Sequence, residues 1–268
     1  MLIDDLASRL LDLFPASDAE PWDHVGLSVG RPDDEVAKVA LALDANVDSI
    51  RAAAELGANV LLTHHPVYIK APSAFLASTN RLPASSRAVF EAIERRVSII
   101  SLHTNLDRSH AARMRISHVM GLSPLTSLEF PDDPARPGLG AIAEMPGLPL
   151  DEVVERAAGG FGSCPRVWGD PDRTVRRIGL LGGSVGDLGE LAIAAGVDVL
   201  VCGEAGYHVC QDLSLRGCDV ILLGHDRSEA PFVDILRDST MRAGIDGEHI
   251  VTIGCLDQWW THTKGERS

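Results

Sequence analysis

Apolar residues along the chain fall into short continuous runs that alternate with segments of helical period. The run VALAL at 39–43 is short and uninterrupted, as expected of a parallel strand that is buried on both faces. A segment with apolar residues at helical spacing follows at 46–57 and ends at Gly57, where a glycine commonly terminates a helix. The run NVLLT at 59–63 predicts a second buried strand, so the stretch as a whole is a strand-helix-strand unit.

The same order of elements returns in the second half of the chain. The run IGLLG at 178–182 predicts a strand, residues 188–196 predict a helix that ends in glycine, and VDVLVC at 197–202 predicts the next strand. A third strand is predicted after each unit, at 97–101 in the first half and at 218–223 in the second. Strands that alternate with helices in this way are typical of an α/β fold.

These repeated units predict a fold class of two related α/β domains, with largely parallel or mixed sheets flanked by helices. Residues 128–150 hold five prolines and several glycines, which is a composition typical of a connection. We therefore expect a discontinuous first domain at 1–127 plus 219–268, which would carry the metal site described below, and a second domain at 128–218.

Residues 1–14 predict an amphipathic helix rather than a secretory leader. Apolar residues recur there with helical period, and Asp4 and Asp5 stand where a leader would carry Lys or Arg. The longest apolar runs are far shorter than the roughly 18 to 20 residues that are needed to cross a bilayer. We expect a cytoplasmic protein without a membrane span.

Net charge and cysteine content argue against two further classes of protein. The chain of 268 residues has a formal charge of −14 and only three lysines, which argues against nucleic acid as a partner because backbone binding depends on Lys and Arg. Five cysteines without a Cys-x-x-Cys pair fit neither a disulfide framework nor a zinc ribbon. We expect them to be reduced thiols in the core.

Side chains with metal-ligand chemistry follow three of the predicted strands. In open parallel sheets, ligands gather outside the carboxyl ends of the strands, so the polar residues at these ends are candidates for a site. They are His64 and His65 after the first strand, His103, Thr104, Asn105 and Asp107 after the second, and His225, Ser228 and Glu229 after the third. His, Asp and Glu are ligands of transition metals such as Zn, Fe or Mn.

Two divalent ions fit this pattern better than one. Successive residues that leave a strand point to opposite sides, and Pro66 favours an extended backbone at the residue before it. The rings of His64 and His65 should therefore diverge, so that each can hold its own ion.

The remaining candidates complete the two predicted sites. Asp107 would complete one site and His225 the other, while Glu229, four residues beyond His225, would bridge both ions. The alternative stays open that each histidine is a hydrogen-bonded loop residue, which is the more common role of a single histidine at the end of a strand. Suitable side chains at three strand ends together favour metal binding.

Five motifs, in this order along the chain, resemble those of the Nif-three-like family. They are WDHVGL at 22–27, THHP at 63–66, HTNLD at 103–107, CGEAGYH at 202–208 and GHDRSE at 224–229. Members of this family are dinuclear metal proteins that are often labelled GTP cyclohydrolase I type-2-like. The resemblance implies two α/β domains, two metal ions per chain and a toroidal homo-hexamer, a trimer of dimers, whose metal centres face an inner cavity.

Carried over residue by residue, the resemblance implies a set of metal ligands in this chain. They are His64, His65, Asp107, His225 and Glu229. The chain departs from the family pattern at His24 and Ser28, where Asn and Gln are usual.

Three further residues are candidates for catalysis. His103 is interpreted as a proton carrier or a support for a ligand, and equally as a buried histidine that backbone groups satisfy. Glu204 and His208 are candidate acid-base or substrate-positioning groups if the two halves face each other across a cleft, with a purely structural role as the alternative.

Two other features allow more than one interpretation. Residues 179–187 are rich in glycine and follow a strand, so their amides could hold a phosphate. A tight strand-to-helix turn is favoured, because the segment is not a P-loop and no Lys follows it. Trp259 and Trp260 would cover an oligomer contact or close the core.

The leading hypothesis is a metal-dependent hydrolase that acts on a small nucleotide-like or phosphorylated metabolite. Arg108, Arg113 and Arg227, near the expected mouth of the site, are the local support for a phosphate. The alternative is a non-catalytic metal-binding regulator or metal carrier. A third possibility is a nucleotide-binding module that uses the glycine-rich turn without metal.

Overall fold

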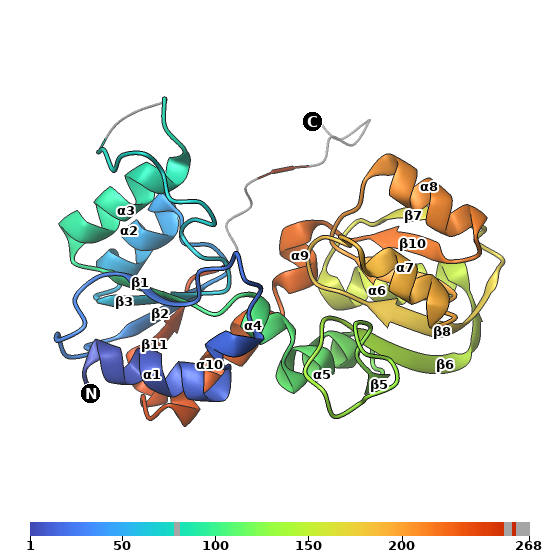
Figure 1. Cartoon of the computed structure of the whole chain (residues 1–268), viewed down its shortest axis with the longest axis horizontal. Helices are drawn as coiled ribbons and strands as arrows, with labels where there is room; N and C mark the ends of the chain where they lie inside the picture. The colour runs from blue at the N-terminus through green and yellow to red at the C-terminus, as the bar shows by residue number, and fades with distance from the viewer. Residues whose placement is uncertain (78–80, 255–258, 261–268) are drawn as a thin grey trace, which may run out of the picture.

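The computed structural model describes residues 1–77, 81–254 and 259–260. The chain forms two α/β lobes that lie side by side, each built around one sheet (Figure 1). The N-terminal residues start the first lobe, and the chain passes into the second lobe near residue 110 and returns near residue 230 (Figure 1).

The first sheet has five strands within the described residues. In spatial order they are β1 (Gly26–Val29), β4 (Ser98–Ser101), β3 (Val60–Thr63), β2 (Val39–Ala42) and β11 (Ile250–Thr252). β1, at one edge, is antiparallel to β4, and the other pairs are parallel. All residues of β2, β3 and β4 are buried, which explains why their sequences are largely apolar without alternation.

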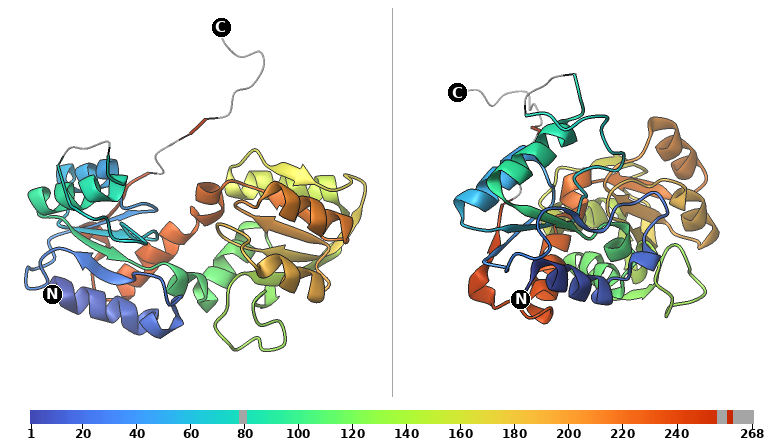
Figure 2. Two further views of the ribbon diagram at one scale, coloured as in Figure 1. Left: turned by 45° about the horizontal axis from the view of Figure 1, so that its top comes forward. Right: turned by 60° about the vertical axis from the view of Figure 1, so that its left-hand side comes forward.

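Helices cover both faces of the first sheet (Figures 1 and 2). They are α2 (Val47–Glu55) and α3 (Ala84–Arg95) on one face, and α1 (Ile3–Leu13) and α10 (Phe232–Arg242) on the other. Alternate strand residues serve the two faces: Leu61 packs with the first pair of helices and Leu62 with the second.

The second sheet has six strands within the described residues. In spatial order they are β5 (Pro124–Thr126), β6 (Ala141–Pro149), β8 (Thr174–Leu180), β9 (Val199–Cys202), β10 (Asp219–Leu222) and β7 (Arg166–Trp168). β8, β9 and β10 are parallel and form the centre, while the three remaining strands are antiparallel to their neighbours.

Helices also cover both faces of the second sheet. They are α5 (His110–Val119) and α6 (Leu150–Phe161) on one face, and α7 (Leu188–Ala194) and α8 (Tyr207–Leu215) on the other. As in the first lobe, strand residues alternate between the faces, since Val201 packs with the first pair of helices and Leu200 with the second.

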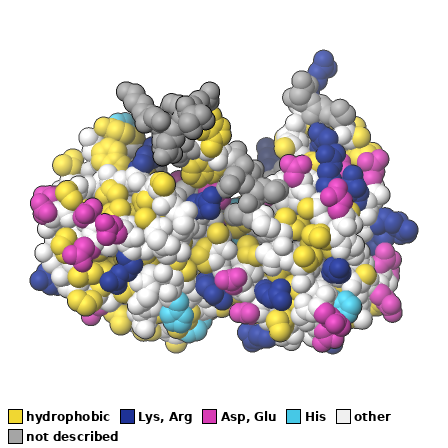
Figure 3. Space-filling view, turned by 180° about the vertical axis from the view of Figure 1, so that it is seen from behind, with side chains coloured by type: hydrophobic (Ala, Val, Ile, Leu, Met, Phe, Trp, Pro, Cys, Tyr) yellow, Lys and Arg dark blue, Asp and Glu magenta, His cyan; other side chains and the backbone are white. Residues whose placement is uncertain are grey.

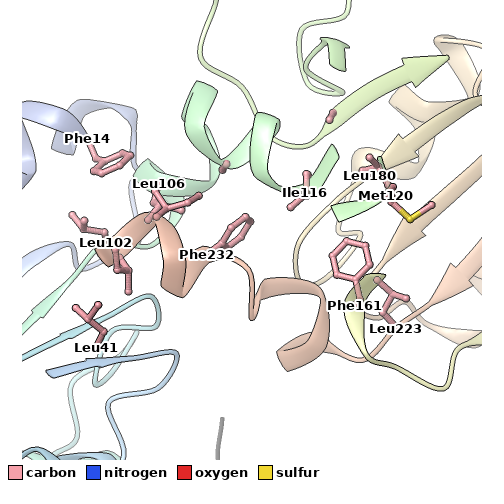
Figure 4. Packing of buried hydrophobic residues seen from close by; sticks show 14 of the residues in the cluster. Phe14, Leu41, Leu102, Leu106, Ile116, Met120, Phe161, Leu180, Leu223 and Phe232 are labelled. Carbon is pink, nitrogen blue, oxygen red and sulfur yellow. The ribbon is translucent and has the colours of Figure 1, made fainter. Parts of the chain in front are cut away.

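One hydrophobic cluster runs through both lobes. It contains Leu41 and Leu62 of the first sheet and Leu180 of the second. Phe232, at the start of α10, is 1% exposed and lies between the side chains of the two lobes (Figure 4). The two sheets therefore share a core rather than being joined by chain connections alone.

A short helix follows the third parallel strand of each lobe. These helices are α4 (Thr104–Asp107) after β4 and α9 (His225–Glu229) after β10, and both lie between the lobes (Figure 1). Two single turns of 3-10 helix complete the described elements, η1 (Ala16–Asp18) and η2 (Gly247–His249). The order strand, helix, strand, helix, strand, short helix is thus common to both lobes.

The predicted fold class is confirmed: the chain has two sheets flanked by helices, one largely parallel and one mixed. The apolar run at 39–43 forms β2, the run at 59–63 forms β3, and the helix predicted at 46–57 is α2. Asn46 caps α2 by accepting a hydrogen bond from the amide of Ser49 at 2.9 Å.

The second sheet differs from expectation in two places. Residues 128–150, interpreted as a connection, include the whole of β6, whose nine residues pair with β8. The strand at 219–222, which the expected domain boundaries assign to the first domain, is β10 and pairs in register with β9, with Val220 opposite Leu200. The return to the first sheet occurs later, through α10 and β11.

The cysteines are free thiols where the structure describes them. Cys202, Cys210 and Cys218 are buried in the second lobe, Cys164 is exposed, and Cys255 lies outside the described residues. Burial raises the pKa of the Cys218 thiol to about 12, so it stays protonated at neutral pH.

The surface mixes charges of both signs. On the face seen in Figure 3, acidic side chains are interspersed with Lys and Arg over both lobes. Within residues 1–77, 81–254 and 259–260, no helix has the length and apolar character that a membrane crossing requires.

Candidate metal centre

Short helices and strand ends from both lobes meet at one place. His64 and His65 directly follow β3, Asp107 is the last residue of α4, and α9 begins with His225 and ends with Glu229. The spacing of His225 and Glu229 repeats that of His103 and Asp107, four residues apart at the same point of each lobe. The shared order of elements thus brings a histidine and a carboxylate to the interface from each side.

Among the residues that the structure describes, three overlapping groups of side chains have ligand atoms within 4.8 Å of one another. The groups are His64, His65 and His103; His65, His225 and Glu229; and His64, Asp107 and Glu229. The structure therefore brings together the five side chains predicted as metal ligands, and His103 with them. Glu229 belongs to two groups, in which it accompanies either His64 or His65, which is the arrangement expected of a bridging carboxylate.

His64 is fully buried and has one nitrogen without a partner. Its Nδ1 lies 2.9 Å from the carbonyl oxygen of Leu102, and since a carbonyl can only accept, Nδ1 carries the proton. Nε2 then presents a lone pair 3.4 Å from Oδ1 of Asp107 and 3.8 Å from Oε1 of Glu229. Nε2 of His64 and Oδ1 of Asp107 are buried without a hydrogen-bond partner among the described residues. Two facing lone pairs are costly unless a cation lies between them, so these residues fit a metal ion.

His65 lies between two carboxylates. Its Nδ1 donates to Oδ1 of Asp44 at 2.7 Å, and its Nε2 lies 2.8 Å from Oε2 of Glu229. His64 and His65 thus approach different oxygens of Glu229, as expected if each holds its own ion. Burial lowers the pKa of His65, but the hydrogen bonds with Asp44 and Glu229 outweigh it and raise the pKa to about 10.

His225 has the same environment as His65. Its Nδ1 lies 3.0 Å from Oε1 of Glu204 and its Nε2 lies 3.2 Å from Oε2 of Glu229. The hydrogen bond with Glu229 raises the pKa of His225 to about 9. In the metal-free protein, the rings of His65 and His225 therefore each share a proton with Glu229, at the places where divalent ions would bind.

The pKa values of the two carboxylates nearest to His64 are shifted in opposite directions. Burial raises the pKa of Asp107 to about 7. Burial also opposes ionisation of Glu229, but its contacts with His225, His64 and His65 hold the pKa of this carboxyl well below its usual range. A negative charge at Glu229, enclosed by three imidazoles, is suited to cation binding.

A third carboxylate orients His103. Nδ1 of His103 donates to Oδ1 of Asp23 at 2.9 Å, and the other oxygen of Asp23 accepts from the amide of Thr104 at 3.0 Å. Burial opposes ionisation of Asp23, but hydrogen bonds from His103 and Thr104 hold its pKa well below the usual range. All four histidines of the site thus have Nδ1 fixed by an acceptor, an arrangement typical of histidines that bind metal through Nε2.

Two cavities meet at His65 and His225. The first, of about 500 Å³, lies between the lobes and is lined by the site residues and by apolar side chains of both lobes. The second, of about 710 Å³, reaches the site from the side of Asp44 and Glu204. Trp259 lines the second cavity, and its indole N–H donates to Oδ1 of Asp226 at 3.2 Å.

The glycine-rich segment forms a tight turn against α9. Gly183 has φ +66°, and a Cβ at this position would lie 2.5 Å from Oε1 of Glu229. The amide of Gly183 donates to the hydroxyl of Ser228 at 2.9 Å. A glycine is therefore needed where this turn passes close to Glu229 of α9, and its amide is engaged by a protein group.

A family model for the Duf34/NIF3 (NGG1p interacting factor 3) proteins matches residues 1–253 of the chain. The chain belongs to the Duf34/NIF3 family. The resemblance inferred from its five motifs is confirmed by this match.

Relatives of this Duf34/NIF3 protein extend over nearly its whole length. A Streptomyces coelicolor protein named GTP cyclohydrolase 1 type 2 homolog is 31% identical over 277 residues, which cover 97% of this chain and 94% of the relative. A Clostridium perfringens protein of the same name is 26% identical, over 94% of this chain and 96% of the relative.

Solved structures show the same fold. A Bacillus cereus protein related to NIF3 matches with a TM-score of 0.85 at 18% identity, over 98% of this chain and 99% of that protein. Reduced HcgD from Methanocaldococcus jannaschii matches with a TM-score of 0.77 at 21% identity, over 94% and 97% of the two chains.

Two of the residues predicted for catalysis, Glu204 and His208, are not members of the candidate metal groups among the described residues of this Duf34/NIF3 protein. Glu204 reaches the site through His225. His208 lies in the first turn of α8, exposed, and its ring packs edge-on against Tyr207 with centroids 5.2 Å apart.

One residue of the site, Asp44, is missing from the sequence prediction. It follows β2 at the same sheet edge as His64, so the rule of reading strand ends applies to it as well. Its position shortly before a helix makes it resemble a capping residue, although the cap of α2 is Asn46.

Proposed function

We propose that this Duf34/NIF3 protein binds two divalent transition-metal ions, Zn, Fe or Mn, and hydrolyses a small molecule with their help. The ligands would be His64, His65, Asp107, His225 and Glu229. The observation that carries the proposal is the pair of buried, unpartnered atoms, Nε2 of His64 and Oδ1 of Asp107, that face each other within the described part of the chain.

Hydrolysis follows from the chemistry that such a centre supports. When bound, two divalent ions polarise a carbonyl or phosphoryl group and activate water for attack. Asp23 fixes the proton of His103 on Nδ1, so Nε2 is free to take up or return a proton at the edge of the first cavity. His103 is thus the candidate proton carrier, whereas Glu204 positions His225.

The names of the relatives are consistent with this class of reaction. Curated relatives from several bacteria are named GTP cyclohydrolase 1 type 2 homolog. A cyclohydrolase adds water to a ring carbon, which is a hydrolysis of the type that the site would support.

A metal carrier or regulator is the second candidate function. The observation that favours it is exposure, since the side chains of His225 and Glu204 are 40% and 60% exposed. An ion held there would be accessible from solvent through the second cavity, as release to a partner requires.

Metal content tests the ligand assignment. The wild-type protein should retain about two ions per chain after gel filtration, and His64→Ala should lose about one, measured by elemental analysis. His208→Ala removes an exposed histidine outside the site and serves as the matched control. Equal content in all three proteins would contradict the assignment.

Turnover separates the hydrolase from the carrier. The protein loaded with Mn, Fe or Zn should hydrolyse at least one compound among nucleotides, phosphoesters, carboxyl esters and amides, and Glu229→Gln should abolish the reaction. If no compound in this screen turns over while the ions pass readily from the wild type to an acceptor chelator, and faster still from Glu204→Gln, the carrier function is supported instead.

We also propose that the chain assembles as a homo-hexamer, a trimer of dimers. The family resemblance supports this assembly, which would place the metal centres around an inner cavity. Light scattering should give a mass about six times the 28.6 kDa of one chain.

A further inference from the structure

We infer that the substrate of the proposed centre is an uncharged small molecule with an apolar part of ring size, rather than a nucleotide polyphosphate. The inference rests on the proposed function in one respect only, which is that the reacting end of the substrate lies at the metal centre. The first cavity, which contacts Asp107, His225 and Glu229 at its floor, is the place where the rest of the substrate would lie.

The walls of this cavity are mainly hydrocarbon. Both lobes contribute to them through Trp22, Ile69, Leu139, Leu181, Leu188 and Phe232. The volume of about 500 Å³ lies within the usual range for small-molecule sites, and two or three fused rings would fill much of it. Trp22 is 52% exposed and Ile69 is 44% exposed, so an apolar ligand would cover hydrocarbon at the rim that is now in contact with water.

Cationic side chains are missing from the walls. Among the described residues that line the cavity, the charged or titratable ones are histidines and carboxylates, and none is Lys or Arg. A polyphosphate is normally held by Arg, Lys or free backbone amides, because its charges must be compensated when water is removed.

Three arginines lie close in sequence to the site, and all three contact protein groups. Nε of Arg227 lies 3.9 Å from Oδ2 of Asp226, and Arg227 is not among the residues that line the first cavity. Arg108 pairs with Glu20 and Glu129 and donates to the carbonyl of Asp18. Arg113 is 3% exposed, and its two terminal nitrogens donate to backbone carbonyls in the loop at 134–136. The side chains of Arg108 and Arg113 thus hold protein groups, and neither lines the first cavity.

Carboxylates around the histidines weaken the attraction of the centre for anions. Those in contact with a site histidine are Asp23, Asp44, Asp107, Glu204 and Glu229. When ionised, these carboxylates carry one negative charge more than two divalent ions can balance, so the loaded centre would not draw a polyphosphate by net charge. An uncharged group that coordinates through one oxygen has no such requirement.

Binding of an uncharged fluorescent probe tests the inference in the metal-free and in the Zn-loaded protein. We expect 1-aminoanthracene, a neutral three-ring amine, to bind once per chain with enhanced fluorescence. Ile69→Ala should weaken binding about five- to tenfold and Trp22→Ala at least as much, because each removes hydrocarbon from the rim. Ile93→Ala makes the same change at an exposed position of α3 outside the cavity and should have no effect.

Competition identifies the preferred charge of the ligand. Uncharged 2-naphthol should displace the probe, whereas GTP and inorganic pyrophosphate at millimolar concentration should not, in either form of the protein. The inference is overturned if GTP or pyrophosphate displaces the probe as well as 2-naphthol does. It is overturned equally if the probe fails to bind, or binds alike to Ile69→Ala and Ile93→Ala.

These results are independent of the proposed function. The metal-free protein reports on the cavity whether or not ions bind, and metal content reports on the ligands whether or not the cavity is apolar. A protein that retains no ions but binds the probe at Ile69 would contradict the metal centre alone.

Discussion

At the level of single residues, the candidate centre is organised by the hydrogen-bond acceptor that contacts Nδ1 of each histidine. Carboxylates hold His65, His103 and His225, and a backbone carbonyl holds His64. Such contacts fix the ring orientation, so that Nε2 of each ring already faces the centre before any ion arrives. The arrangement lowers the cost of organising the ligands on binding.

Replacement of Asp44 tests this organisation. Asp44→Asn keeps an oxygen for the Nδ1 proton of His65 but removes the charge, so we expect metal affinity to fall about 10-fold, and up to about 100-fold in Asp44→Ala. Titration against a fluorescent zinc chelator measures the change. Asp12→Asn, at an exposed position of α1, is the control. Affinities that agree within about twofold in all variants would show that Asp44 does not support the ligand.

The proposed ligand residues could be brought forward from the sequence because their chemistry is local. His64, Asp107 and Glu229 are recognisable as side chains placed just beyond apolar runs, whichever sheet those runs join. The hydrogen bonds that orient them are not local: Asp44 is 21 residues from His65, and Asp23 is 80 residues from His103. Such pairings depend on the order of the strands, which the sequence pattern does not specify.

At the level of elements, the same distinction between local pattern and distant pairing separates the strands that the sequence predicts from those that it does not. Central parallel strands such as β3 are buried on both faces and appear as continuous apolar runs. β6 has only three consecutive buried residues before it becomes largely exposed, and it contains Pro146 and Gly147, so it resembles a loop. The sheet to which β10 belongs depends on its pairing with β9, and a local apolar pattern carries no information about that partner.

The glycine-rich turn before α7 provides a test at this level. Gly183→Ala would force a Cβ to within 2.5 Å of Oε1 of Glu229, so we expect loss of metal and destabilisation by about 1–3 kcal/mol. Gly186→Ala is the matched control, because Gly186 also has a positive φ, +51°, but no atom of the described residues lies within 4 Å of the place that its Cβ would take. It should cost only about 1 kcal/mol and leave metal content unchanged. Metal analysis and urea unfolding measure both effects, and loss of metal in both variants would contradict the proposed clash.

An ion pair between α2 and α3 provides a test of pH dependence. Hydrogen bonds from Arg51, at 2.7 Å, and from Arg95 lower the pKa of Glu91 from 4.5 to about 2. A folded-state pKa below the unfolded value means that the stabilisation is complete above about pH 4.5 and is lost as the pH falls towards 2. Because both arginines are partly exposed, we expect Glu91→Gln to cost only about 1 kcal/mol at neutral pH.

The measurement is the difference in unfolding free energy between wild type and Glu91→Gln at several pH values. The difference should be constant at neutral pH and should shrink below about pH 4.5. Glu94→Gln changes an exposed residue of the same helix and controls for the loss of one negative charge. A difference that grows as the pH falls would have the wrong sign for this ion pair.

At the level of the whole molecule, the position of the site depends on the shared core. The proposed ligands come from both lobes, so their geometry requires that the lobes keep a fixed relation. The hydrophobic cluster that contains Phe232 supplies this constraint, since it joins the side chains of α10 to those beneath the second sheet (Figure 4). The ring of Phe232 also packs against His64, with centroids 5.1 Å apart.

The shared core predicts that the two lobes unfold together. In metal-free protein at fixed concentration, far-UV and near-UV circular dichroism should report one coincident denaturant transition. Phe232→Ala removes a buried ring at the junction and should lower the free energy of unfolding by about 3–5 kcal/mol. Phe75→Ala, at a position that is 42% exposed, makes the same substitution away from the core and should cost about 0.5 kcal/mol or less. Two separate transitions in the wild type, or equal costs for the two variants, would mean that the lobes are independent and that their contact does not fix the metal ligands.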